Sequence, residues 1–223
     1  MANYGMAFDY ELCIDCHACE VACKEENGIS LGMEHRRLWI QKDGDIEGDF
    51  WNIDKSSVSF IQMQCQNCVN PPCLEACERK AIYIDENAIV RIYKDKCDLL
   101  LSCMKACPYD ARYIDDTHFF TDKCIFCADT RLARGETTTA CQITCPAKLR
   151  YFGDLNDEKS EIVQMLKKRN FFVLKESEGT IPKLFYFIPK NKEFAQKTIE
   201  KGTKIYTWGE MKPKIKPLNL KKI

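Results

Sequence analysis

All fifteen cysteines of this 223-residue chain lie in four short runs, a pattern that indicates metal binding. Most neighbouring cysteines of a run are only a few residues apart, so three or four thiolates can gather around one small metal cluster. Few uses of cysteine other than a cubic iron–sulfur cluster need thiolates so close together. The pattern therefore predicts electron transfer. The runs are Cys13, Cys16, Cys19 and Cys23; Cys65, Cys68, Cys73 and Cys77; Cys97, Cys103 and Cys107; and Cys124, Cys127, Cys141 and Cys145.

The spacing within the runs indicates how they share clusters. The first run reads C-x2-C-x2-C-x3-C, as in bacterial ferredoxins with two clusters, where the fourth cysteine of one run ligates the other run's cluster. Cys107 and Cys145 are followed by Pro108 and Pro146, as the fourth cysteine of such a run often is. The third run is one cysteine short, because Leu100 stands where a cysteine would complete the spacing.

Other uses of cysteine fit the sequence poorly. A structural zinc site pairs one C-x2-C motif with another, or with two histidines farther along the chain, and this chain has three histidines. One of them, His17, lies inside the first cysteine run, and it is more consistent with a solvated neighbour of the ligands than with a ligand. A disulfide framework suits a short secreted chain with an even number of cysteines. Here the number is odd and no apolar signal region begins the chain.

Composition narrows the function further. Lys plus Arg and Asp plus Glu both total 33, so the zero formal charge argues against a nucleic-acid binder. No apolar run reaches the roughly 18 residues of a membrane span. We expect a protein that matures in the cytoplasm and works there or at the membrane surface, unless a partner with a signal exports it. There is no Ser-His-Asp set, no catalytic carboxylate pair and no glycine-rich dinucleotide loop, so we expect no substrate chemistry of its own.

The elements that must position the cysteines are short and repeat along the chain. Alternating apolar residues predict a strand at residues 6–10, and a helix is expected at residues 18–26. Hairpins are expected at residues 81–92 and 112–121, and another strand at residues 149–152. Cores this small bury little apolar area, so the clusters must contribute to folding. The predicted fold class is α+β, with two bacterial-ferredoxin-like two-cluster modules, inserted hairpins, and a C-terminal helix followed by an extended arm.

Two segments lie outside this repeat. Residues 29–61 contain Trp39 and Trp51 around a polar loop and are predicted to form an inserted hairpin, whose aromatic residues belong either to a local core or to a partner surface. After residue 155 we expect a helix capped by Asn156 or Asp157 and ending at Asn170, then a strand at residues 184–188. The Lys-rich segment beyond Lys183 is either a solvated tail or an arm that becomes ordered on another subunit, and we favour the arm.

These signals divide the chain into four parts. One ferredoxin-like module comprises residues 1–28 and 118–157, and a second comprises residues 57–117. The inserted hairpin comprises residues 29–56. The C-terminal helix and partner-binding arm comprise residues 158–223.

Several features together resemble one protein family. They are the four runs, Leu100, the insertion after the first run, the segment Lys123-Cys124-Ile125-Phe126-Cys127, and the segment Arg150-Tyr151-Phe152-Gly153-Asp154-Leu155. The chain resembles the four-cluster iron–sulfur electron-transfer (beta) subunits of molybdopterin oxidoreductases of the dimethyl sulfoxide reductase superfamily, such as nitrate, polysulfide and arsenate reductases. The resemblance covers about residues 5–190.

The resemblance implies four ligand sets, because in that family the first run pairs with the fourth and the second with the third. Three sets would hold [4Fe-4S] clusters, and the set that lacks a fourth cysteine would hold a [3Fe-4S] cluster. The [4Fe-4S] sets are Cys13, Cys16, Cys19 and Cys145; Cys23, Cys124, Cys127 and Cys141; and Cys65, Cys68, Cys73 and Cys107. The [3Fe-4S] set is Cys77, Cys97 and Cys103.

Three interpretations of Leu100 stay open. The first and favoured one is a [3Fe-4S] cluster that lacks the iron at the unligated corner. The second is a [4Fe-4S] cluster whose fourth iron binds water or a carboxylate such as that of Asp98. The third is an empty site.

The function that follows is an electron relay rather than an enzyme. The clusters would carry single electrons between a large subunit with a molybdopterin (Mo or W) site and a second redox partner, for example a membrane subunit that reacts with quinone. An alternative is the electron-transfer subunit of a hydrogenase or of an aldehyde or formate oxidoreductase. Less favoured is a hydro-lyase that uses an open iron at the Leu100 site, because Leu99, Leu100 and Leu101 make that site apolar. A redox sensor is also less favoured, because four clusters are more than sensing needs.

Overall fold

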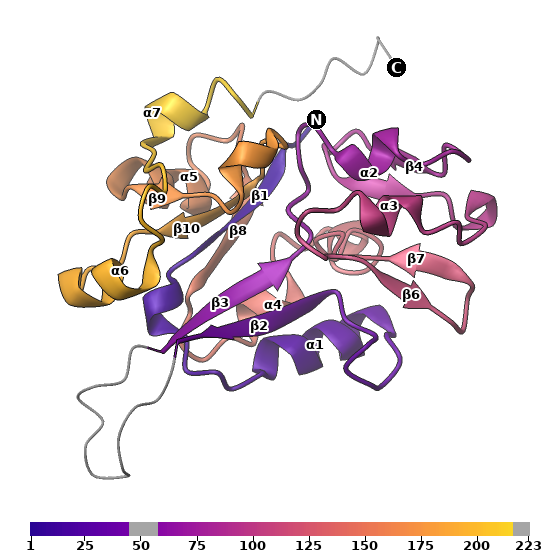
Figure 1. Ribbon diagram of the computed structural model, residues 1–223, viewed down its shortest axis with the longest axis horizontal. Coiled ribbons are helices and arrows are strands. Elements are labelled where there is room, and N and C mark those ends of the chain that lie inside the picture. The colour runs from indigo at the N-terminus through magenta and orange to yellow at the C-terminus, as the bar shows by residue number, and fades with distance from the viewer. Residues whose placement is uncertain (45–57, 216–223) are drawn as a thin grey trace.

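The computed structural model describes residues 1–44 and 58–215, and a four-stranded sheet lies at its centre. The strand order is β8 (Arg150–Asp154), β1 (Tyr4–Phe8), β10 (Leu184–Phe187) and β9 (Phe171–Phe172). β1 pairs antiparallel with β8 and parallel with β10. The strands predicted near residues 6–10, 149–152 and 184–188 are thus all present, and they meet in one sheet (Figure 1).

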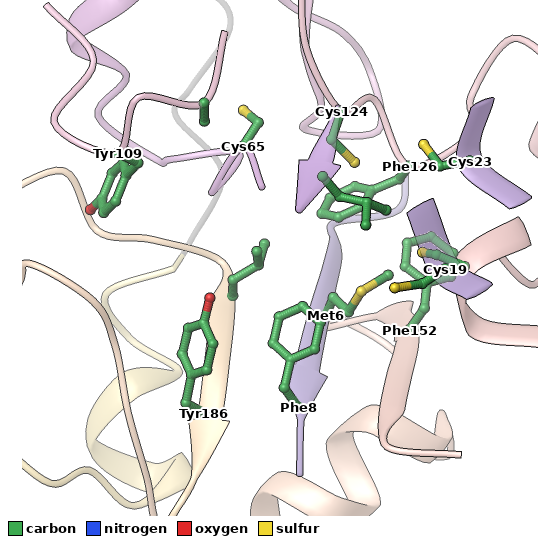
Figure 2. Packing of buried hydrophobic residues seen from close by; sticks show 14 of the residues in the cluster. Met6, Phe8, Cys19, Cys23, Cys65, Tyr109, Cys124, Phe126, Phe152 and Tyr186 are labelled. Carbon is green, nitrogen blue, oxygen red and sulfur yellow. The ribbon is translucent and has the colours of Figure 1, made fainter. Parts of the chain in front are cut away.

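The two faces of this sheet pack against different parts of the molecule. Met6 and Phe8 of β1, with Tyr186 of β10, belong to the core that contains the cysteine loops (Figure 2). The alternate residues Phe185 and Phe187 belong to a second core with α5 (Glu161–Lys168) and α7 (Trp208–Met211). The alternation of side chains along a strand produces this separation. One face of the sheet therefore supports the candidate metal sites, and the other has an apolar core without cysteine.

The elements that carry the cysteines are short. α1 (Ala18–Asn27) ends at Gly28, whose φ of 60° gives the left-handed conformation common just after a helix. This agrees with the helix expected at residues 18–26. The other cysteine-bearing helices have four residues each: α2 (Pro72–Glu75), α3 (Ser102–Lys105) and α4 (Ala140–Ile143). Single turns of this kind are not stable as isolated helices. Within residues 1–44 and 58–215 the 3-10 helices are Tyr10–Leu12, Lys94–Lys96, Leu132–Arg134 and Glu176–Glu178.

Three hairpins surround the cysteine loops, and two of them were expected at these places. The first expected hairpin is β4 (Ile82–Ile84) with β5 (Val90–Ile92), and the second is β6 (Tyr113–Asp115) with β7 (Phe120–Asp122). The inserted hairpin consists of β2 (Leu38–Asp43) and β3 (Ser59–Gln64). Its second strand begins at Ser59, after the proposed boundary at residue 56, and the division of the chain into domains stays a prediction. Trp51 lies outside the described residues.

The C-terminal part differs most from expectation. α5 begins later than predicted, after the N-cap Ser160, because residues 157–160 form a turn before it. Beyond Lys183 the chain supplies an inner strand of the sheet, then α6 (Lys192–Thr198) and α7, and Tyr206 and Trp208 are buried in the second core. The expectation that this segment lacks packing within the chain is therefore wrong for residues 184–215.

Candidate iron–sulfur sites

Four cavities in the described part of the chain are each lined by one of the predicted sets of cysteines. Each spans about 280 to 330 Å³ of space not filled by protein atoms, part of which is open to solvent. Among the described residues no three Cys, His, Asp or Glu side chains form a site for a single metal ion, and the sulfurs surround cavities instead. We name the cavities by their cysteines: site I (Cys13, Cys16, Cys19, Cys145), site II (Cys23, Cys124, Cys127, Cys141), site III (Cys65, Cys68, Cys73, Cys107) and site IV (Cys77, Cys97, Cys103).

The loop of site IV has the same backbone pattern as the loop of site I. In site I, Asp15 and His17 on either side of Cys16 have φ of 55° and 56°. In site IV, Leu99 and Leu101 on either side of Leu100 have φ of 58° and 61°. A left-handed conformation is uncommon for residues other than glycine, and such turns direct successive N–H groups into a concavity that suits an anion. The Leu100 loop therefore keeps a shape that fits an anionic cluster, although it lacks one thiolate.

The surroundings of Leu100 are more exposed to solvent than the sequence predicted. Leu100 is 50% exposed. Polar residues also line site IV, among them Glu78, Arg79, Ser102 and Thr121. The loop presents Leu100 to the surface, so the leucines do not close this site to water, although Leu100 and Leu101 still line it.

Asp98, the carboxylate considered as a substitute ligand, already has a partner. Its Oδ2 accepts a hydrogen bond from Arg79 Nε, and this bond and the charge of Arg79 lower the pKa of Asp98. Ligation of iron by Asp98 would require this ion pair to open.

Backbone and side-chain N–H groups point at several of the sulfurs. The backbone N–H groups of Asn67 and Ala81 donate to the sulfurs of Cys65 (3.5 Å) and Cys77 (3.3 Å). Such donors stabilise negative charge on the sulfurs of a cluster. Gln64 Nε2 donates to Cys124 Sγ, at 3.7 Å.

The thiols themselves are poor anions without a metal. Burial raises the pKa of Cys19 to about 11, although the charge of Arg150 partly offsets it. Burial likewise raises the pKa of Cys124 to about 12, with the neighbouring Cys141 adding to the effect. Buried thiolates of this kind need a cation, and iron ions in a cluster would supply it.

Comparison with known proteins identifies the family of this chain. Residues 56–155 match a family described as 4Fe-4S dicluster domain. The B component of polysulfide reductase from Wolinella succinogenes is 42% identical over 188 residues, which cover 82% of this chain and 93% of the relative. The chain belongs to the iron–sulfur electron-transfer subunits of the dimethyl sulfoxide reductase superfamily. Other relatives are the thiosulfate reductase electron transfer subunit PhsB of Salmonella typhi (34% identical; 82% and 91% covered) and protein NrfC of Escherichia coli (37% identical; 82% and 79% covered).

Membership of this family confirms the main functional prediction. The chain is a non-catalytic iron–sulfur subunit that transfers electrons within a molybdopterin oxidoreductase complex. The α+β class and a ferredoxin-like domain with [4Fe-4S] clusters agree with the family match. No helix in the described residues is long and apolar enough to cross a membrane.

Sequence reasoning about this electron-transfer subunit missed three buried arginines, each lining a site. Arg150 lines site I, Arg37 lines site II and Arg112 lines site III, and their exposed fractions are 3%, 9% and 5%. A signal for two of them is present in the sequence: Arg112 and Arg150 are each the fifth residue after the cysteine of a Cys-Pro pair. Arg37 has no such signal, because the inserted hairpin brings it to site II.

Proposed function

We propose that this subunit carries four clusters, [4Fe-4S] at sites I, II and III and [3Fe-4S] at site IV, and passes single electrons along them in that order. The observation that carries this proposal is that each of the four cavities is lined by one complete predicted set of cysteines. A bound iron–sulfur cluster supplies reversible one-electron chemistry. The polypeptide supplies thiolates, hydrogen bonds and an enclosed path between neighbouring sites.

Shared elements support the order of the sites. Cys19 of site I and Cys23 of site II lie one turn apart on α1. Sites II and III meet at Asn67, whose side-chain Nδ2 lies 3.5 Å from both the Cys65 and the Cys124 carbonyl oxygens. Sites III and IV meet where the short helices α2 and α3 pack together. A linear path from site I to site IV follows from these contacts.

The two ends of this path reach the surface, whereas its middle is enclosed. Cys16 of site I is exposed, and the neighbouring Ile14 is 66% exposed. At site IV, Leu100 is 50% exposed. The sulfurs between sites II and III, on Cys65 and Cys124, are buried. We infer that electrons enter at one end and leave at the other, with the catalytic molybdopterin subunit at one end and a second redox partner, for example a quinone-reactive membrane subunit, at the other.

For site IV we propose the [3Fe-4S] form. The loop at residues 97–103 retains the concave backbone of a cluster loop, which argues against an empty site. Leu100 offers no ligand atom, and Asp98 is held by Arg79. The polar surroundings of site IV leave room for a [4Fe-4S] cluster with water at one iron, and this is the second candidate.

The apolar surface around site I favours a stable complex with the catalytic subunit. His17 lines site I, and Val21 lies one turn farther along the same face of α1 and is 67% exposed. Ile143 on α4, which packs against α1, is 56% exposed. Exposed apolar groups gathered beside a redox site are typical of a protein interface.

We expect Val21→Glu with Ile143→Glu to reduce recovery of the native complex, because two carboxylates would be desolvated at the interface. The expected loss of affinity is at least about tenfold, or roughly 1.4 kcal/mol. The measurement is the amount of catalytic subunit that copurifies with a tagged chain. Leu31→Glu is the matched control, because Leu31 is 87% exposed and lines none of the four sites. A wild-type chain that always purifies alone as a monomer would contradict the proposal.

A further inference from the structure

Arg112 and Arg150 occupy equivalent positions in the two halves of the cysteine pattern. Each is the fifth residue after a cysteine that is followed by proline, Cys107 for Arg112 and Cys145 for Arg150. Each also lies at the start of a strand, since Arg150 begins β8 and Arg112 immediately precedes β6. Both guanidinium groups are buried. The repeat therefore carries not only ligands but also one buried cation in each half.

Each of these arginines faces the sulfurs of two sites. Arg112 Nη2 donates to Cys73 Sγ of site III at 3.2 Å, and Cys73 belongs to the same buried cluster as Cys103 of site IV. Arg150 lines site I, and it reaches site II through Gln64, which accepts from Arg150 Nη1 and whose Nε2 donates to Cys124 Sγ of site II. One guanidinium thus serves sites III and IV, and the other serves sites I and II.

Within the described residues neither cation is neutralised by a carboxylate. Among those residues no protein atom accepts a hydrogen bond from Arg112 Nη1 or from Arg150 Nη2, although both atoms are buried. Arg150 Nη1 donates to the neutral amide oxygen of Gln64, at 3.3 Å. A buried charge is costly unless it has a counter-charge, so these N–H groups indicate an anion within the cavities.

The other two arginines that line the sites are each paired with a carboxylate. Arg37 at site II donates to Asp122 Oδ2 at 2.7 Å, and Asp122 also accepts from the hydroxyl group of Tyr113. Arg79 at site IV is paired with Asp98 and is largely exposed. These two pairs add little net charge to their sites, so among the arginines that line the sites the uncompensated positive charge lies on Arg112 and Arg150.

We propose that Arg112 and Arg150 are potential-setting residues, each of which raises the reduction potentials of both sites that it faces. The inference rests on the ligand sets of the proposed function. Reduction adds one electron, and therefore one negative charge, to a site. A fixed, uncompensated cation between two sites stabilises the reduced state of either one. It also offsets the repulsion between electrons on neighbouring sites, so an electron can move within the pair without a steep rise in energy.

The test is a potentiometric titration, followed by electron paramagnetic resonance, of the full chain in its native complex. Arg112→Gln should lower the equilibrium constant for one-electron reduction at sites III and IV by about tenfold or more, and a tenfold change equals about 59 mV for one electron. Sites I and II should stay unchanged. Arg150→Gln should produce the converse pattern, and Arg112→Lys and Arg150→Lys should restore most of each loss. Lysine keeps the charge but not the forked geometry.

A matched control removes an equally buried arginine together with its charge partner. Arg37→Gln with Asp122→Asn deletes one positive and one negative charge at site II, so all potentials should shift by much less than tenfold in equilibrium constant. The iron content of every variant is measured in parallel. Iron at fewer than four sites in the wild type would contradict the proposed function, whereas full iron with unshifted potentials in both Gln variants would overturn only this inference.

Loss of iron in the Gln variants still leaves the inference testable. If the Lys variants then retain iron at wild-type potentials, the positive charge is what the site pair requires, and the inference is supported. If the Lys variants lose iron as the Gln variants do, the shape of the guanidinium matters rather than its charge, and the inference is overturned.

Discussion

Removal of iron should unfold the cysteine-bearing half of the molecule and leave the second core of the sheet packed. α2, α3 and α4 are single turns, and β4 to β7 have three residues each, so none of these elements is stable alone. The sulfurs and the space they surround form much of their common core. Structural metal sites contribute folding free energy on the order of 10 kcal/mol, and the clusters should do the same here.

The second core contains no cysteine and should behave differently. Ile162 and Leu166 of α5 pack with Phe185 and Phe187 of β10, and α7 covers them with Trp208. In hydrogen exchange, amides of α1 to α4 should lose protection by at least about a thousandfold after chelation of iron, or roughly 4 kcal/mol of opening free energy. Amides of α5 and β10 should lose far less. Equal loss in both regions, or no loss in α1 to α4, would contradict a folding role of the clusters.

Leu100→Cys should change the type of cluster at site IV. The wild type, if it binds [3Fe-4S] there, should show in the oxidised state an electron paramagnetic resonance signal near g = 2, on the order of one spin per chain. A cysteine at position 100 would stand between two left-handed residues, as Cys16 does in site I. The backbone needs no rearrangement, so the added thiolate should complete a [4Fe-4S] set. The oxidised signal should disappear, and a new signal should appear only on reduction.

Leu100→Ala is the control for this experiment, because it removes the side chain without adding a ligand. The signal near g = 2 should persist in that variant. The conversion in Leu100→Cys should also lower the potential of site IV, since [3Fe-4S] clusters commonly titrate above [4Fe-4S] clusters. An oxidised wild type without this signal, but with iron for four complete clusters, would mean that site IV holds [4Fe-4S] with a ligand other than cysteine. In that case the Asp98→Asn variant would show whether the Asp98 carboxylate, released from its pair with Arg79, is that ligand.

The local structure was predictable where local sequence determines it. The helix that ends at Gly28 and the hairpin with its turn at residues 85–87 need only neighbouring residues, and both are present. The groups of cysteines that the family resemblance implies likewise line common cavities. Ligation of iron by those groups stays a prediction, as does the division into two modules at the stated residues.

The global arrangement depended on contacts between distant residues and could not be predicted in the same way. β10 pairs with β1 across more than 170 residues of sequence, and no short pattern encodes such a parallel pair. The Lys-rich composition after Lys183 suggested an unpacked arm, but the few apolar residues there, such as Tyr206 and Trp208, are buried in the second core. Three leucines in a row suggested that site IV is closed to water. The left-handed residues Leu99 and Leu101 instead direct Leu100 to the surface.

The most direct test of the relay is the amount of iron bound by the anaerobically prepared native protein, measured together with the integrated resonance signals. Three [4Fe-4S] clusters and one [3Fe-4S] cluster predict about fifteen iron atoms per chain, with about one spin near g = 2 in the oxidised state and three further clusters seen on reduction. About eight iron atoms per chain, with signals from only two clusters, would contradict a four-site path and with it the central claim.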